Sequence, residues 1–332
     1  MGEAVEAVQQ APTQESRPVG VVPARLIVSP DGAMVPLGGG EWAEVKTVVV
    51  GEEVVEEREQ EPHRIHLSYF SRLANAQTFT EQASGEWLRR GVDQAKQVCA
   101  VMDGAEWIDG FLDWQCPNTW RVLDFAHAAE YVNAIGQLAQ ADGSLLPPHW
   151  VSKQLPELKR QGPCTLLAEV RRLRERHQSE EDLSKTVASL EKREARRQYP
   201  QYQADHWPIG SGCVERGKKV VMQARLKGAG MHWEPAHVNP MLALRTSACH
   251  DRWDEAIGQA RSHLGTLRLD TRRAHQRWRY EQRLRPLLVH LWMLTSRSRS
   301  SAPAPSETVS LRHGPSRPSA PHPWRKPLLA KK

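Results

Sequence analysis

The chain has 332 residues, 39% of them hydrophobic, and 45 Lys and Arg against 39 Asp and Glu. These values suit a globular protein of one large or two modest domains, exclude a fibre, and give a small basic excess that favours polyanionic partners. Five cysteines without a Cys-x-x-Cys pair exclude a zinc ribbon and predict reduced thiols. No apolar run reaches the roughly 18 residues that span a bilayer, and the first residues lack signal-peptide features. The sequence therefore predicts a soluble cytoplasmic protein with no membrane partner.

The N-terminal half of the chain predicts an α/β sheet. Residues 1–23 are rich in Gln, Glu, Ala and Pro without a period, which predicts a disordered arm. Short apolar and β-branched runs then predict strands at residues 25–29, 33–37, 42–50, 64–70, 98–102 and 120–123. Apolar positions at helical spacing predict helices at residues 80–96, 105–114 and 124–138. Strands that alternate with helices indicate a sheet covered by helices, so we place the first part of a catalytic core at residues 24–145.

The remaining segments differ in composition. The acidic stretch 52–61 predicts a solvated loop, and residues 146–205, dense in Leu, Glu, Arg and Lys, predict an all-helical insertion. The second part of the core is predicted at residues 206–262, with helices over 215–227 and 240–262. C-terminal helices are predicted at 263–294, and a basic disordered tail at 295–332.

Two Asp-Gly pairs follow strand-like runs. Asp31 and Asp103 each come where a predicted strand ends, so we expect them to lie side by side at one edge of the sheet and to share a divalent ion. Burying two carboxylates together without a cation would raise the pKa of one of them. The plainer interpretation is that Asp-Gly is a common turn pair, and for either motif alone that interpretation is the stronger one.

A third acidic residue, Glu215, follows Gly210-Ser211-Gly212. We expect Ser211 to cap a helix that begins near Cys213, which sets Glu215 in the first turn, facing the end of the sheet. The alternative is a glutamate that only complements the helix dipole. Two divalent ions held by such acids can clamp the attacking and leaving oxygens of a phosphodiester, as on a ribonuclease-H-like sheet.

Two further features surround these acids. Asp124 and His127 lie three residues apart at a strand-to-helix transition, where Asp124 can orient the imidazole and His127 can position a phosphate; the alternative is a helix N-cap beside a ring. A basic group after Glu215 is suited to DNA phosphates, with an aromatic ring to stack on a base, although a charged helix face is more often only solvated. Its members are Arg216, Lys218, Lys219, Arg225, Lys227 and Trp233.

Four stretches resemble a known group of enzymes. They are VMDGAEWIDGFLDWQCP, RVLDFAHAAEYV, WPIGSGCVERGKKVVMQARLKGAGMHW and NPMLALR. Together they resemble the catalytic region of bacterial insertion-sequence transposases of the ISKra type, relatives of the Mutator-like DDE transposases, over about residues 24–260.

The resemblance implies a ribonuclease-H-like mixed sheet flanked by helices, with an all-helical insertion before the last catalytic residue. It implies that Asp31, Asp103 and Glu215 are the catalytic triad and bind two Mg²⁺ or Mn²⁺ ions, and that Asp124 and His127 are the supporting element. The implied partners are insertion-sequence ends and target DNA, bound by a homo-oligomer at the bacterial nucleoid.

The chain departs from the family at two places. Family members carry a DNA-recognition region ahead of the first catalytic strand, so we expect a shortened copy with weak discrimination between cognate ends and random DNA. In the family, a Ser or Ala usually follows the glutamate before the basic residues, whereas here Glu215 is followed by Arg216 and Gly217. A glycine inside a helix costs about 1 kcal/mol relative to Ala. Three hypotheses therefore stay open: a transposase that cleaves and transfers strands, a nuclease that only hydrolyses, and an inactive transposase-derived DNA-binding protein.

Overall fold

The computed structural model describes residues 1–10, 23–54, 63–143, 146–147, 149–177, 180–250 and 252–297. The chain divides into a first unit, residues 1–268, and a second, residues 269–332. Within the described ranges, no helix is both long enough and apolar enough to cross a membrane.

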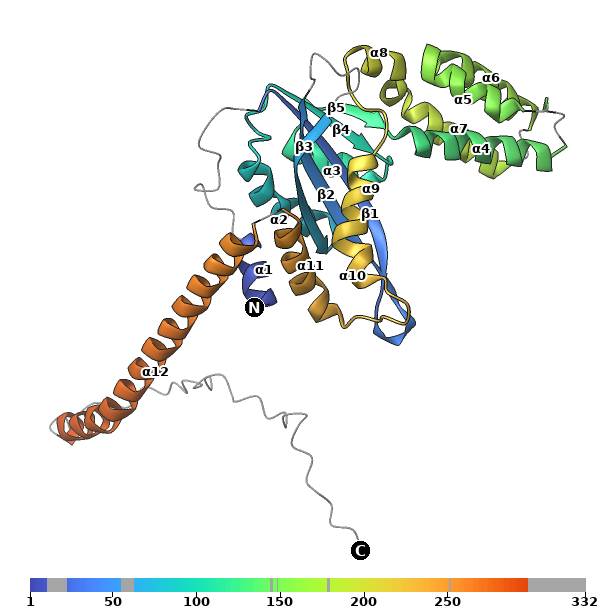
Figure 1. Ribbon diagram of the computed structural model, residues 1–332. Helices are drawn as coiled ribbons and strands as arrows, with labels where there is room; N and C mark the ends of the chain where they lie inside the picture. Colours follow the sequence, from blue (N-terminus) through green and yellow to red (C-terminus); the bar gives the residue numbers. More distant parts are fainter. Residues whose placement is uncertain are drawn as a thin grey trace, which may run out of the picture. The chain divides into compact units, whose positions relative to one another are not determined.

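The first unit is an α/β structure built on a mixed five-stranded sheet in the order β3-β2-β1-β4-β5 (Figure 1). The strands are β1 (Arg25–Pro36), β2 (Trp42–Val54), β3 (His63–Leu73), β4 (Gln97–Met102) and β5 (Trp120–Leu123). Strands β1, β2 and β3 pair antiparallel, whereas β4 runs parallel to β1 and β5 runs parallel to β4. The parallel pairs bring the carboxyl ends of β4 and β5 to the same edge.

The first hairpin differs from the prediction. We expected Asp31-Gly32 to end a strand and residues 33–37 to return as its partner, but β1 is one strand in which Asp31 pairs with Thr47 of β2. The turn lies instead at Gly38–Gly40, where Gly39 and Gly40 have φ values of 77° and 83°. Glycine adopts these positive φ values without a steric penalty, and the backbone at Asp31-Gly32 stays extended.

Both faces of the sheet are covered, which explains why strand β4 is almost continuously apolar. On one face, Leu26, Val28 and Ala100 pack against two helices, α2 (Ala76–Arg89) and α3 (Glu106–Gln115). On the other face, the core includes side chains from the helices α4 (Phe125–Ala141), α9 (Gly212–Gly217), α10 (Ala224–Leu226) and α11 (Pro235–Cys249). Helix α2 begins at Ala76, four residues before the predicted start, because the Asn75 side chain accepts the Thr78 amide and caps it.

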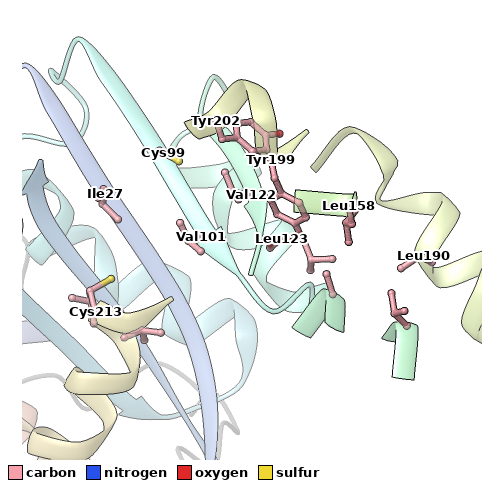
Figure 2. Packing of buried hydrophobic residues seen from close by; sticks show 14 of the residues in the cluster. Ile27, Cys99, Val101, Val122, Leu123, Leu158, Leu190, Tyr199, Tyr202 and Cys213 are labelled. Atoms are coloured by element: carbon pink, nitrogen blue, oxygen red, sulfur yellow. Dashed lines mark hydrogen bonds between the residues drawn. The ribbon is translucent and has the colours of Figure 1, made fainter. Parts of the chain in front are cut away.

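The stretch predicted as an insertion contains helices and, among its described residues, no strand. The helices are α5 (Trp150–Gln161), α6 (Cys164–Arg176), α7 (Glu181–Lys192) and α8 (Tyr199–Ala204), with a short 3₁₀ turn at Glu194–Arg197. Their core is continuous with that of the sheet, since Leu158, Leu190 and Tyr199 belong to the same cluster as Leu123 (Figure 2). The Tyr199 hydroxyl also donates to the Leu123 carbonyl at 3.0 Å, so these helices are anchored directly on β5.

The prediction of a disordered N-terminal arm was wrong for the first ten residues. Helix α1 (Gly2–Gln10) buries Ala4 and Val5 in a small cluster with Ala243 of α11. A helix this short is marginal in water by itself, so this packing, rather than local propensity, holds it. The Gln9 side chain adds a hydrogen bond to the Ser247 hydroxyl at 3.1 Å. The rest of the predicted arm up to residue 22 lies outside the described residues.

The C-terminal helices are also fewer than predicted. Helix α11 ends at Cys249, and one helix, α12 (Trp253–Arg297), replaces the end of the predicted helix 240–262 and the helices of 263–294. Strand β2 continues through Glu52 and Glu53, of which Glu53 is buried, into the stretch predicted as an acidic loop. The remainder of that loop and the predicted basic tail beyond residue 297 lie outside the described residues.

Candidate active site

Three aspartates occupy adjacent positions in the register of neighbouring parallel strands, so they lie at one level of the sheet. Strand β1 pairs with β4 at an offset of 72 residues, from Arg25–Gln97 to Val28–Ala100, and the same offset carries Asp31 to Asp103. The strands stay in contact past the last pair, because the Ser29 hydroxyl donates to the Val101 carbonyl at 2.8 Å.

The same level continues onto the next strand. Strand β4 pairs with β5 up to Met102–Leu123, so Asp124 is the next position after the last pair and stands beside Asp103. The Asp124 amide still donates to the Met102 carbonyl at 2.8 Å. Because neighbouring strands are about 4.8 Å apart, these backbone positions form a compact acidic row at one edge.

Asp31 is the most buried of the candidate ligands. It is 5% exposed, and burial together with the negative charges of Asp103 and Glu215 raises its pKa, against the opposing effect of Lys218. The Lys218 ammonium donates to Asp31 Oδ2 at 2.5 Å. Sequence reasoning had assigned Lys218 to DNA; the contact with Asp31 joins residues 187 apart in the chain.

Asp103 is held by the loop that follows β4. One of its oxygens, Oδ1, accepts the Ala105 amide at 2.8 Å, a local turn that leaves Oδ2 for other ligands. Gly104 has a φ of 88°, and a Cβ there would lie 2.7 Å from the Arg193 side chain. Arg193, from the helical segment, donates to the Gly104 carbonyl at 2.7 Å. The helical stretch 146–205 therefore holds the loop after Asp103 in place through Arg193, and no local sequence signal indicates this role.

Glu215 reaches the acidic row through Lys218. It lies in α9, its side chain is 45% exposed, and its Oε1 accepts from the Lys218 ammonium at 2.7 Å. Since the same ammonium contacts Asp31 Oδ2, the two carboxylate oxygens lie within about 5 Å of each other. Burial opposes a charged lysine, but the hydrogen bonds to both carboxylates raise the pKa of Lys218 and keep it protonated.

Ser211 does not cap α9 with its side chain, contrary to the prediction. Its hydroxyl donates instead to Asp124 Oδ2, and the Phe125 amide donates to the Ile209 carbonyl at 2.9 Å. The loop before Glu215 is thus tied to the start of α4. Long-range pairing with a buried carboxylate has replaced the local cap.

Asp124 and His127 form a hydrogen-bonded pair, as predicted from their spacing. Asp124 caps α4 through the Ala126 amide at 3.0 Å, and His127 Nδ1 lies 3.3 Å from Oδ2. Burial opposes ionisation of Asp124, but hydrogen bonds from His127, Ser211 and Ala126 lower its pKa, while the bond to Asp124 raises the pKa of His127. Both oxygens of Asp124 are engaged within the protein, so it is suited to orient His127 rather than to bind an ion.

No three His, Cys, Asp or Glu side chains converge tightly enough to hold a metal ion anywhere in the described part of the chain. At the acidic row, the Lys218 ammonium takes the position between Asp31 and Glu215 that a cation would occupy. The donors are carboxylate oxygens, the hard ligands that Mg²⁺ and Mn²⁺ prefer. By donor chemistry and by this stand-in cation, the residues fit a divalent ion.

Gly217 is required by close packing. A Cβ at this position would lie 2.8 Å from the Tyr69 ring and 3.0 Å from Val49, which brings α9 against β2 and β3. Glycine lowers the stability of the helix at this position, but the absence of a side chain is what lets α9, and with it Glu215, approach the sheet.

We expect Gly217→Ala to lower the free energy of unfolding by about 1–2 kcal/mol, because the overpacking cost exceeds the gain in helix propensity. Gly212→Ala in the same helix is the matched control, since nothing lies within 4 Å of its Cβ position. Urea unfolding of both variants decides this; equal stability of the two would mean that the helix shifts away from Tyr69 at no cost.

The basic group after Glu215 lies on a helical run interrupted by a π-helical segment, Lys218–Gln223. Such segments occur frequently at functional sites. The exposed members of the group are Arg216, Lys219, Arg225 and Lys227. Trp233, the aromatic member of the group, is half-buried, packs against the core and forms a β-bridge with Leu37.

Comparison with known proteins adds no identification. A scan against protein-family models gave no match, and a search of curated proteins gave none either.

Proposed function

We propose that the chain is a DDE-type DNA transposase that cleaves DNA at the ends of an insertion sequence and transfers the strand to target DNA. The observation that carries the proposal is the acidic row: Asp31, Asp103 and Asp124 share one level of the sheet, and Glu215 is linked to Asp31 through one ammonium. The strand order β3-β2-β1-β4-β5, antiparallel and then parallel, supports a ribonuclease-H-like sheet.

The candidate ligands are Asp31, Asp103 and Glu215, which would hold two Mg²⁺ or Mn²⁺ ions. When bound, these ions would supply Lewis-acid stabilisation of the phosphodiester and a deprotonated attacking oxygen. His127, with its raised pKa, carries a positive charge beside this edge over a wider pH range than a free histidine and is suited to hold a phosphate. Asp124 acts through it as a positioning residue.

The positively charged surface around the site favours DNA as the partner. Four exposed cations surround the site: Arg216, Lys219 and Arg225 lie on the helical run that begins at Gly212, and Lys227 directly follows its end. Contacts of this type bind DNA phosphates and carry little sequence information. Assembly as a homo-oligomer on DNA and a location at the nucleoid belong to the same proposal and rest on the family resemblance alone.

The test uses the full chain with Mg²⁺ or Mn²⁺, labelled duplexes that carry the element's ends, random duplexes of equal length, and a plasmid target. Products joined to the plasmid support the transposase. Hydrolysis without joining would replace it with the nuclease hypothesis, and binding without either product would replace it with the inactive DNA-binding protein. A chain that neither cuts nor binds would overturn all three.

DNA affinity should fall steeply with salt, and Arg225 and Lys227 should contribute to that slope. For Arg225→Gln with Lys227→Gln, we expect the slope of log K against log salt to decrease in magnitude by up to about 2, roughly 0.9 per lost phosphate contact. Lys159→Gln with Arg160→Gln removes the same charge from an exposed part of α5 and serves as the control. Gel-shift titrations at several salt concentrations measure the slope for both double variants. Identical slopes would show that Arg225 and Lys227 do not contact DNA phosphates.

A further inference from the structure

Lys218 differs from the other cations of its helical run. Arg216 and Lys219 on either side are exposed, whereas the Lys218 side chain is 13% exposed and its ammonium points into the acidic row. Its two contacts, 2.5 Å to Asp31 and 2.7 Å to Glu215, join the first acid of the row to the glutamate of α9. A surface lysine that only attracts DNA would gain nothing from this burial.

The electrostatics of the row explain why a cation is needed there. Asp31 is nearly fully buried next to the charges of Asp103 and Glu215, and uncompensated carboxylates in such a place are strongly unfavourable. One ammonium removes much of that penalty. A divalent ion on the same oxygens would repel the ammonium and remove its two acceptors, so both cations cannot occupy the position together.

We propose that Lys218 is a tethered competitor for the metal position: its ammonium holds Asp31 and Glu215 together in the metal-free protein and is displaced when a divalent ion binds. This inference rests on the proposed metal site. A lysine has the flexible four-carbon stem that such a movement needs. The start of the π-helical segment at Lys218 places it where helix geometry is already irregular.

The consequence is a weakened apparent affinity for metal. If the lysine-bridged state accounts for nine-tenths of the metal-free molecules, the apparent dissociation constant for metal rises about tenfold. We therefore expect Lys218→Gln to bind Mn²⁺ about tenfold more tightly than the unaltered chain, and Lys218→Arg, which keeps a cation, to bind no more tightly than it.

Electron paramagnetic resonance of free Mn²⁺ during titration measures these affinities without any DNA. Lys219→Gln and Arg216→Gln remove the same charge from exposed neighbours and should change the affinity by less than about threefold, because screened surface charges act weakly. An affinity in Lys218→Gln that is unchanged, lower, or raised only as much as in these controls would overturn the proposal.

A second measurement needs no substitution. Acetylation of lysines by a water-soluble ester, followed by mass spectrometry, should modify Lys218 slowly in the metal-free chain and severalfold faster with saturating Mg²⁺, while Lys219 stays constant. If metal binds and the modification of Lys218 does not change, the ammonium is a fixed ion pair and the proposal fails.

A further variant distinguishes failure of the proposed metal site from failure of the proposed competition by Lys218. Asp103→Asn alters a candidate ligand outside the Lys218 bridge, which joins Asp31 and Glu215. If the chain binds no Mn²⁺, or binds it equally well after Asp103→Asn, the metal site itself is absent from the acidic row, whatever Lys218 does. If Asp103→Asn abolishes binding and Lys218→Gln leaves it unchanged, the metal site stands and only the competition is excluded.

Discussion

Asp103→Asn should reduce DNA strand cleavage by about a thousandfold or more while leaving the fold intact. The substitution keeps the size of the side chain and the acceptor for the Ala105 amide, but it removes the charge at the centre of the acidic row. Stabilisation of transition-state charge by a metal site is worth several kcal/mol, and about 4 kcal/mol corresponds to a thousandfold in rate. Single-turnover cleavage of an end-bearing duplex measures the effect, with circular dichroism to verify folding.

The matched control is Glu106→Gln. Glu106 is an acid three residues further along, at the exposed start of α3, and takes no part in the acidic row. We expect its cleavage rate to stay within about twofold of the unaltered chain, since exposed surface charges contribute little. Comparable losses in the two variants would indicate a general charge effect, and full activity of Asp103→Asn would remove this residue from the catalytic assignment.

Stability should fall as the pH drops from about 6.5 towards 4, with His250 as a main cause. His250 packs at the end of α11 against Tyr69, where burial lowers its pKa to about 4. His250 Nε2 lies 2.8 Å from the Tyr69 amide and 2.7 Å from the Tyr69 carbonyl, and the Arg252 guanidinium contacts Nδ1. A second proton would face the Arg252 guanidinium.

The sign follows from proton binding. The unfolded chain protonates this histidine below its ordinary pKa of 6.5, and the folded chain does so only near 4, so the unfolded state binds more protons between these values. The free energy of unfolding therefore decreases with falling pH across that window, by at most about 3 kcal/mol, and the effect levels off below pH 4.

Urea unfolding at pH 7.5, 6, 5 and 4 tests this. His250→Gln removes the titration, so we expect a flatter curve over the same window. His237→Gln, at an exposed histidine of the same helix, should keep the slope of the unaltered chain. An unchanged slope in His250→Gln would assign the acid sensitivity to other groups.

The parts of the fold that the sequence predicted well are those with a local signal. Strand β4 is a run of apolar residues because both faces of the sheet are covered, and Asp103 ends it. The four residues of β5 and the spacing of Asp124 and His127 were likewise recognisable from neighbouring residues alone. Asp-Gly at position 31 misled the prediction because that pair is common in turns, and the three glycines at 38–40 supply the turn.

The sequence by itself determined which acids are available and that two of them follow strands. Tertiary structure alone decided that Asp31 shares a level with Asp103 and that Lys218 reaches it across 187 residues. It also decided that Ser211 pairs with Asp124 and that α1 is ordered against α11. The physical reason is range: hydrophobic period and capping act between neighbours, whereas strand register and the compensation of buried charge depend on which distant segments pack together.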